Sequence, residues 1–303
     1  MSPKPIPAPR EEGFTTTTAS PIYWAKYGRV GASRLLVLHG GPGADHRYLL
    51  PQMLRLGESH DLLFYDQCGG GQSKSDARTP VTWKTYVEDM GAIVREFGTD
   101  PLAIVGYSWG GMLALLYAME QRKNPELLAP SRLALINPAP VTQEYRRQFE
   151  AEFARRQQSA EILKMRDELS KSGLRESNPE AYRQRAFEVS VAGYFADPSK
   201  ATDLTPFRVV GRIQQSVWES LGNLDLIRDL QGIKIPSIVI HGRDDPIPLA
   251  SSSEAANALG TNLVVLDDCG HVPYVEQPEK LFAALDPFLD ETNPPRTKLT
   301  NKA

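Results

Sequence analysis

Residues 101–111 read PLAIVGYSWGG, and this stretch decides the fold. The apolar run at its start is typical of a buried strand, and residues 110–121 have the pattern of a helix that opens directly after it. Between the two, residues 106–110 form the G-x-S-x-G pattern of a serine on a sharp strand-to-helix turn. Glycine is needed two positions before and after that serine, because side chains there would collide with neighbouring backbone. Ser108 is therefore a candidate nucleophile; the competing interpretation is a glycine-flanked serine that merely caps a helix.

Five other apolar runs resemble the one at residues 101–108, and they lie at 34–41, 61–67, 132–138, 236–242 and 262–268. Continuous runs of Val, Ile and Leu suit parallel strands covered on both faces, whereas strands with one wet face would alternate. Helical patterns such as residues 82–97 separate several of these runs, which indicates right-handed crossovers. We therefore predict an α/β fold with a mostly parallel central sheet and helices on both faces.

The alternation stops at about residue 141 and resumes at Ile235. In between, aromatic residues recur every four positions from Tyr145, which predicts one helix. Asn178-Pro179-Glu180 predicts the start of a second helix, because it combines an N-cap, a first-turn proline and an acid near the positive end of the helix dipole. The apolar face expected for this second helix comprises Tyr182, Ala186, Val189 and Tyr194.

These patterns predict one discontinuous domain with an insertion. We expect the catalytic sheet domain to comprise residues 1–140 and 231–290. A helical lid at 141–230 would interrupt it. The final segment, 291–303, contains two prolines and no apolar periodicity, and we expect it to be a flexible tail.

The composition excludes several classes of protein. Hydrophobic residues make up 41% of the 303 residues and charged residues 23%, as in ordinary globular proteins. The net charge of −3 supplies no field for nucleic acid or an anionic membrane surface, so we expect neither partner. Two cysteines, Cys68 and Cys269, cannot form a disulfide framework and favour a reducing compartment. A single disulfide between them is the alternative. No apolar run suits a secretory signal or a membrane span, and we therefore expect a cytoplasmic protein; the oligomeric state stays open.

A nucleophilic serine needs a base within hydrogen-bond reach and an acid that orients the base. In strand-turn-helix enzymes of this kind the chain order is Ser, acid, His. Among five histidines, His271 follows the last apolar run, which makes it the candidate base. The acid should follow the preceding run, where HGRDD ends in Asp244 and Asp245. Enzymes of this kind have the pattern of a glycine, two residues and then the aspartate, and this resemblance favours Asp245 over the alternative, Asp244.

The oxyanion formed by attack on a carbonyl needs hydrogen-bond donors that are already in place. Residues 39–43 read HGGPG, in which glycines let the backbone approach a substrate. We predict the N–H groups of Gly41 and Trp109 as the two donors, with Gly40 as the competitor for the first. The other interpretation of HGGPG is a tight turn without a role in catalysis.

Taken together, these motifs resemble those of the proline iminopeptidase family of alpha/beta hydrolases. The motifs that carry the resemblance are HGGPG at 39–43, DQCGGGQS at 66–73, GYSWGG at 106–111, HGRDD at 241–245 and GH at 270–271. The family often has a larger residue where this chain has Cys68. The resemblance implies an alpha/beta-hydrolase fold, no cofactor or metal, and hydrolysis of an N-terminal residue, usually proline, from a small peptide or aminoacyl substrate.

Iminopeptidases resemble one another in using glutamates of the lid to hold the free amino group of the substrate. Glu188 and Glu219 are the candidates here, and the competing interpretation, which the residues favour, is a solvated surface acid at each position. The first functional hypothesis is thus a serine aminopeptidase that releases proline or another small apolar residue. An esterase, lactonase or amidase with the same three residues is the alternative. A ligand-binding protein that retains the hydrolase shell without turnover is a third.

Overall fold

A computed structural model describes residues 5–76, 78, 80–98 and 101–290. The predicted flexible tail at 291–303 lies outside these residues. Eight strands form one sheet in the order β1-β2-β4-β3-β5-β6-β7-β8. The strands are β1 Glu11–Phe14, β2 Tyr23–Gly28, β3 Arg34–Leu38, β4 Asp61–Tyr65, β5 Leu102–Tyr107, β6 Pro130–Ile136, β7 Ser237–Gly242 and β8 Asn262–Leu266. Strands β3 to β8 pair in parallel, and all six predicted runs are found among them.

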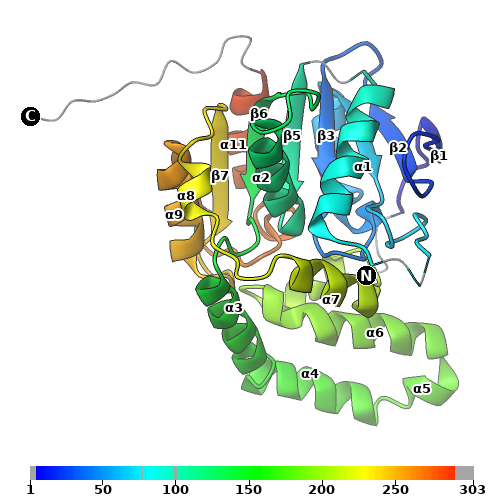
Figure 1. Cartoon of the computed structure of the whole chain (residues 1–303). Helices are drawn as coiled ribbons and strands as arrows, with labels where there is room; N and C mark the ends of the chain where they lie inside the picture. Colours follow the sequence, from blue (N-terminus) through cyan, green and yellow to red (C-terminus); the bar gives the residue numbers. More distant parts are fainter. Residues whose placement is uncertain (1–4, 77, 79, 99–100, 291–303) are drawn as a thin grey trace, which may run out of the picture.

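The parallel strands are largely apolar because both faces of the central sheet are buried. In β3, Leu36 and Leu38 belong to one hydrophobic core, and Leu35 and Val37 belong to the other. Helices α1 (Trp83–Glu96), α2 (Trp109–Gln121), α8 (Ile227–Leu230) and α9 (Leu249–Leu259) cover the first core. The 3₁₀ helices η1 (His46–Leu49) and η2 (Gln52–Glu58) and helix α11 (Pro278–Asp290) cover the second. This arrangement is the predicted mostly parallel α/β sheet with helices on both faces (Figure 1).

Strands β1 and β2 are absent from the sequence-based expectation. Both pair antiparallel, β1 with β2 and β2 with β4, at one edge of the sheet. Buried and partly buried residues alternate along β2, which reads YWAKYG. The alternation is typical of an antiparallel strand near the end of a sheet, where one face is better covered, and it differs from the continuous apolar runs that mark the parallel strands.

Between β6 and β7 the chain forms the inserted helices, which lie at one end of the sheet (Figure 1). They are α3 Gln143–Arg156, α4 Ala160–Lys171, α5 Leu174–Ser177, α6 Pro179–Val191, η3 Ala192–Tyr194, η4 Pro198–Asp203 and α7 Gly211–Ser220. Helix α6 begins after Asn178, whose side chain accepts a hydrogen bond from the Ala181 N–H. It ends at Val191, so the expectation that Tyr194 lies on its apolar face is wrong. Tyr194 belongs to η3, where the chain tightens and turns back toward the sheet.

Helix α1 carries an acid in the interior. Asp89 is 6% exposed, and its Oδ2 has no hydrogen-bond partner among the described residues. Burial, with a smaller effect of the Glu88 charge, raises the pKa of Asp89 to about 7. Because the unfolded carboxyl releases its proton at lower pH, the folded state loses stability relative to the unfolded state as pH rises through the window from about 4 to about 7.

We expect Asp89→Asn to remove this penalty. The variant should match the wild type near pH 4 and exceed its free energy of unfolding by on the order of 1–3 kcal/mol at pH 8. Urea unfolding at both pH values measures the difference. Asp203→Asn at an exposed position is the control, with an expected change within about 0.5 kcal/mol. A variant that is less stable than the wild type at pH 8 would contradict the prediction.

Candidate active site

Ser108 lies on the turn between β5 and α2, in a backbone conformation with φ 54° and ψ −118°. This is a region that residues with a side chain rarely adopt. The two flanking glycines are required by contact. A Cβ at Gly106 would lie 2.5 Å from the Gly110 carbonyl oxygen, and a Cβ at Gly110 would lie 2.2 Å from the Leu38 carbonyl oxygen. The turn thus presents Ser108 at the carboxyl end of the sheet, where α/β folds place their ligands.

His271 and Asp245 meet Ser108 at this edge. His271 Nε2 lies 2.9 Å from Ser108 Oγ, and His271 Nδ1 lies 2.8 Å from Asp245 Oδ2. Asp245 follows β7 and is buried, whereas Asp244 is exposed. The structure therefore brings together the three residues selected from the sequence and leaves the alternative acid at the surface.

The Asp245 carboxylate is held on both oxygens. Oδ1 accepts the Ile247 N–H at 2.7 Å, and Oδ2 accepts Asn137 Nδ2 at 2.5 Å in addition to His271. Burial alone would raise the pKa of Asp245, but the charge of His271 and these hydrogen bonds outweigh it and lower the pKa. Asp245 is thus an ionised acceptor, and His271 Nδ1 must carry the proton between them.

Asn137 is a site residue that the sequence reasoning missed. It follows β6, is fully buried and has φ 43°, a conformation that asparagine tolerates better than most residues. Its Nδ2 also donates to the Gly270 carbonyl oxygen at 3.1 Å, so it connects the loop after β7 with the loop after β8. The only available signal was its place directly after a predicted strand at the same sheet edge.

The loop that carries His271 is fixed by the inserted helices. The His271 N–H donates to the Tyr194 carbonyl oxygen at 2.7 Å, and the Tyr194 ring packs against the imidazole at 5.2 Å between centroids. On the other side, Tyr107 packs against the same ring and its hydroxyl donates to the His271 carbonyl oxygen at 2.9 Å. The imidazole of His271 is therefore held between β5 and η3.

Glu276 extends this attachment. It lies in α10 (Pro273–Glu276), is 5% exposed, and accepts the Ala196 N–H at 2.7 Å and the Gly270 N–H at 2.8 Å. Burial raises the pKa of Glu276 to about 7 although these N–H groups favour its ionised form. One carboxylate therefore joins the segment after η3 to the residue before His271.

The two predicted oxyanion donors remain available. Among the described residues, no hydrogen bond uses the backbone N–H of Gly41 or the backbone N–H of Trp109. The Gly40 N–H, in contrast, donates to Tyr48 Oη at 2.6 Å. Gly40 is also tightly packed, because a Cβ there would lie 2.7 Å from Ser108 Cβ. The geometry thus favours Gly41 over Gly40 as the donor from the HGGPG loop.

Gln67 connects the two segments that carry these donors. Its Nε2 donates to the His39 carbonyl oxygen at 2.8 Å, and its Oε1 accepts the Trp109 indole N–H at 2.9 Å. The Gln67 N–H donates to His39 Nε2 at 3.1 Å, so His39 carries its proton on Nδ1, which faces the Gly40 carbonyl oxygen. Burial lowers the pKa of His39 and keeps the ring neutral. The DQ motif therefore positions HGGPG against the elbow.

Asp66, the other residue of the DQ motif, forms a buried pair. Its Oδ1 lies 2.7 Å from His46 Nδ1, and its Oδ2 accepts the Gln72 N–H at 2.8 Å. Burial would raise the pKa of Asp66, but the bond to His46 lowers it. A Cβ at Gly71 would lie 2.1 Å from Asp66 Oδ2, which explains the glycine there.

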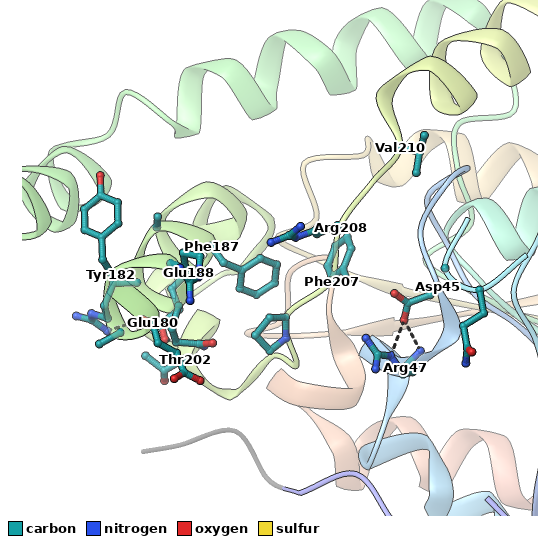
Figure 2. Close-up of a pocket in the computed structure, with 18 of the residues that line it drawn as sticks. Asp45, Arg47, Glu180, Tyr182, Phe187, Glu188, Thr202, Phe207, Arg208 and Val210 are labelled. Carbon is teal, nitrogen blue, oxygen red and sulfur yellow. Dashed lines mark hydrogen bonds and ion pairs between the residues drawn. The ribbon is translucent and has the colours of Figure 1, made fainter. Parts of the chain in front are cut away.

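The two candidate glutamates lie in different surroundings. Glu188 on α6 is 3% exposed and lines a cavity of about 1490 Å³ (Figure 2). Its carboxylate already accepts Arg185 Nη1 at 2.5 Å and Gln184 Nε2 at 3.0 Å. Glu219 is exposed on α7, accepts Gln215 Nε2 at 2.7 Å, and does not line the cavity.

The two cysteines, candidate metal ligands and apolar helices of the described residues were compared with what a thiol site, a metal site or a membrane span requires. Both Cys68 and Cys269 are free and buried, and burial raises the pKa of each thiol, to about 12 for Cys68. No group of three His, Cys, Asp or Glu residues suited to a metal ion occurs within residues 5–76, 78, 80–98 and 101–290. None of the helices in those ranges combines the length and apolar character needed to span a bilayer.

Comparison with known proteins decides the family. Residues 35–285 match the profile that describes the alpha/beta hydrolase family. The chain belongs to the alpha/beta hydrolase family. This membership confirms the fold class expected from the strand pattern, and it establishes a hydrolase scaffold around the residues described above.

Within the alpha/beta hydrolases, the resemblance to proline iminopeptidases is also confirmed. The proline iminopeptidase of Saccharolobus solfataricus is 26% identical, over 93% of this chain and 93% of that protein. The proline iminopeptidase of Clostridium botulinum is 25% identical, over 93% of this chain and 99% of that protein. The crystal structure of the proline iminopeptidase of Mycobacterium smegmatis superposes with a TM-score of 0.66 at 21% identity, over 92% of this chain and 97% of that one.

Proposed function

We propose that this alpha/beta hydrolase is a serine hydrolase that uses Ser108, His271 and Asp245. The observation that carries the proposal is the unbroken series of hydrogen bonds from Ser108 Oγ through the His271 ring to Asp245 Oδ2. Because Nδ1 carries the proton shared with Asp245, Nε2 is free to accept the proton of the serine hydroxyl.

The reaction follows from this arrangement. Ser108 Oγ forms a bond to the carbonyl carbon of the substrate while its proton moves to His271 Nε2. The oxyanion accepts hydrogen bonds from the backbone N–H groups of Gly41 and Trp109. His271 then gives the proton to the leaving group, and the acyl-enzyme forms. A water molecule, deprotonated by His271, releases the acyl group and restores the serine.

For the substrate we propose a small peptide from which an N-terminal proline or another small apolar residue is released. Support comes from the names of the relatives at 25–26% identity, which agree with the motifs at 39–43 and 66–73. The required groups come from the chain itself, and the proposal invokes no cofactor or metal.

A second candidate is favoured by the state of Glu188. A carboxylate already bonded to Arg185 and Gln184 is a weaker partner for a substrate amine, and Glu219 is exposed. An esterase, lactonase or amidase with the same three residues needs no acid that binds an amine. This candidate therefore accounts for the pairing of Glu188 directly.

A substrate series distinguishes the two. We expect cleavage of prolyl and alanyl 4-nitroanilides, and slow or no cleavage of N-acetylprolyl 4-nitroanilide, which lacks the free amine. Rapid hydrolysis of 4-nitrophenyl butyrate without cleavage of any nitroanilide would overturn the peptidase proposal in favour of the esterase. Glu188→Gln, with Glu219→Gln as its exposed control, shows whether the buried acid contributes to KM for the free-amine substrates.

A further inference from the structure

A cavity of about 1490 Å³ lies between the inserted helices and the sheet domain, and Ser108 is not among its lining residues. It is bounded by α6, by residues 45–47 and 71–74, and by the segment 206–210 (Figure 2). Phe207 of that segment packs on Tyr48 at 4.4 Å between ring centroids, and Tyr48 Oη accepts the Gly40 N–H. One aromatic pair thus separates the cavity from the loop that faces Ser108. A substrate that extends from Ser108 past Phe207 would enter this space.

The charges that line the cavity leave a surplus of cations. The lining contains five Lys and Arg residues and four acids. Three of these acids already have partners: Glu188 binds Arg185, Asp45 lies 3.5 Å from Arg47, and Asp66 pairs with His46.

Glu180, in the first turn of α6, is the remaining acid of the lining. The cations of the lining that are not paired with one of its acids are Lys74, Arg183 and Arg208.

Arg208 is the cation best placed to bind a ligand. Its guanidinium has no hydrogen bond or ion pair to any of the residues that the structure describes. Figure 2 shows its side chain extending from the segment beside Phe207 toward Phe187 and Glu188. A free guanidinium offers two parallel N–H groups, the geometry that matches a carboxylate.

The backbone that carries Arg208 is attached at both ends to the sheet domain. Thr205 Oγ1 donates to the Leu50 carbonyl oxygen at 2.6 Å, and the Val210 N–H donates to the Gly43 carbonyl oxygen at 3.0 Å. Gly43 belongs to the HGGPG loop, so the position of Arg208 is fixed relative to the predicted oxyanion donors. These two hydrogen bonds hold the backbone at Arg208 in place, while its side chain is exposed.

The size of the cavity indicates which part of the substrate fills it. Ligand pockets commonly measure about 300–1,000 Å³, and this one is larger. In an aminopeptidase the acyl half is a single residue, which leaves the cavity to the departing peptide. An extended peptide advances roughly 3.3–3.6 Å per residue, so two or three residues bring its end well into such a space.

We propose that this cavity binds the leaving peptide and that Arg208 pairs with its C-terminal carboxylate. The inference rests on the proposed aminopeptidase activity and adds a substrate class to it, namely short peptides with a free C-terminus. The specificity arises from one charge at the far end of the substrate, while the reacting bond stays at Ser108.

The test compares Pro-Gly-Gly as the free acid with the same peptide as its C-terminal amide. In the wild type we expect kcat/KM to be about tenfold higher for the acid, as for one charge-assisted hydrogen-bonded pair. In Arg208→Gln this ratio should fall close to one, and Arg208→Lys should retain part of it. Arg212→Gln is the matched control, because Arg212 is an exposed cation nearby on α7 that does not line the cavity; it should retain the wild-type ratio.

The outcomes distinguish an incorrect role for Arg208 from an incorrect aminopeptidase activity. Equal cleavage of acid and amide by the wild type, or an unchanged ratio in Arg208→Gln, would overturn the assignment of Arg208 and leave the aminopeptidase standing. Failure to cleave either peptide would overturn the proposed activity itself, and the substrate class with it.

Discussion

Replacement of Ser108 by alanine is expected to lower kcat by about 10⁴- to 10⁶-fold on any substrate that the wild type turns over. The hydroxyl is the only group of residue 108 that reaches His271, so no acyl-enzyme can form without it. The same variant should lose reaction with a fluorophosphonate probe. Steady-state turnover and mass spectrometry of the labelled protein measure the two effects.

A control serine shows that the loss is specific. Ser190 is exposed on α6 and donates only to a carbonyl oxygen of its own helix, so Ser190→Ala should retain wild-type turnover and labelling. Residual activity of Ser108→Ala above one per cent would contradict the assignment of the nucleophile. Wild-type protein that neither reacts with the probe nor turns over any ester or amide would instead support the ligand-binding alternative.

Asp245→Asn is expected to lower kcat by about 10⁴-fold with little change in the fold. An asparagine there can present its NH₂ group to His271 Nδ1, which favours the ring tautomer with the proton on Nε2, where it cannot accept from Ser108. The buried side chain of Asn137, which donates to the same oxygen, would meet a second donor. Measurement of kcat at pH 8, with circular dichroism to confirm folding, tests the effect.

The neighbouring aspartate provides a matched comparison. Asp244 is exposed and next in the chain, so Asp244→Asn should change kcat less than about twofold. Equal losses in the two variants would mean that the orientation of His271 does not depend on Asp245. A loss confined to Asp244→Asn would identify the wrong acid.

The parts of the fold that could be predicted are those whose cause is local. A strand covered on both faces must be apolar at every position, and six such runs identified the parallel strands. The turn at Ser108 excludes side chains at Gly106 and Gly110 by direct contact, so glycines at fixed spacing marked the candidate nucleophile. His271 and Asp245 followed from chain order, because each lies directly after a predicted strand.

The features that escaped prediction depend on contacts between distant parts of the chain. Asn137 and Glu276 are polar residues whose importance lies in bonds to Asp245, Gly270 and Ala196, and no spacing pattern reveals them. The pairing of Glu188 with Arg185 could be foreseen from helix spacing. Its burial, which makes that pairing matter, could not be foreseen, because it depends on how α6 packs.

The attachment of the His271 loop couples the inserted helices to the carboxyl edge of the sheet. Any displacement of residues 194–196 away from the sheet breaks the bond from His271 N–H to Tyr194 and the bond from the Ala196 N–H to Glu276 together. The inserted helices and His271 therefore form one mechanical unit, in which a shift of η3 is passed directly to the imidazole.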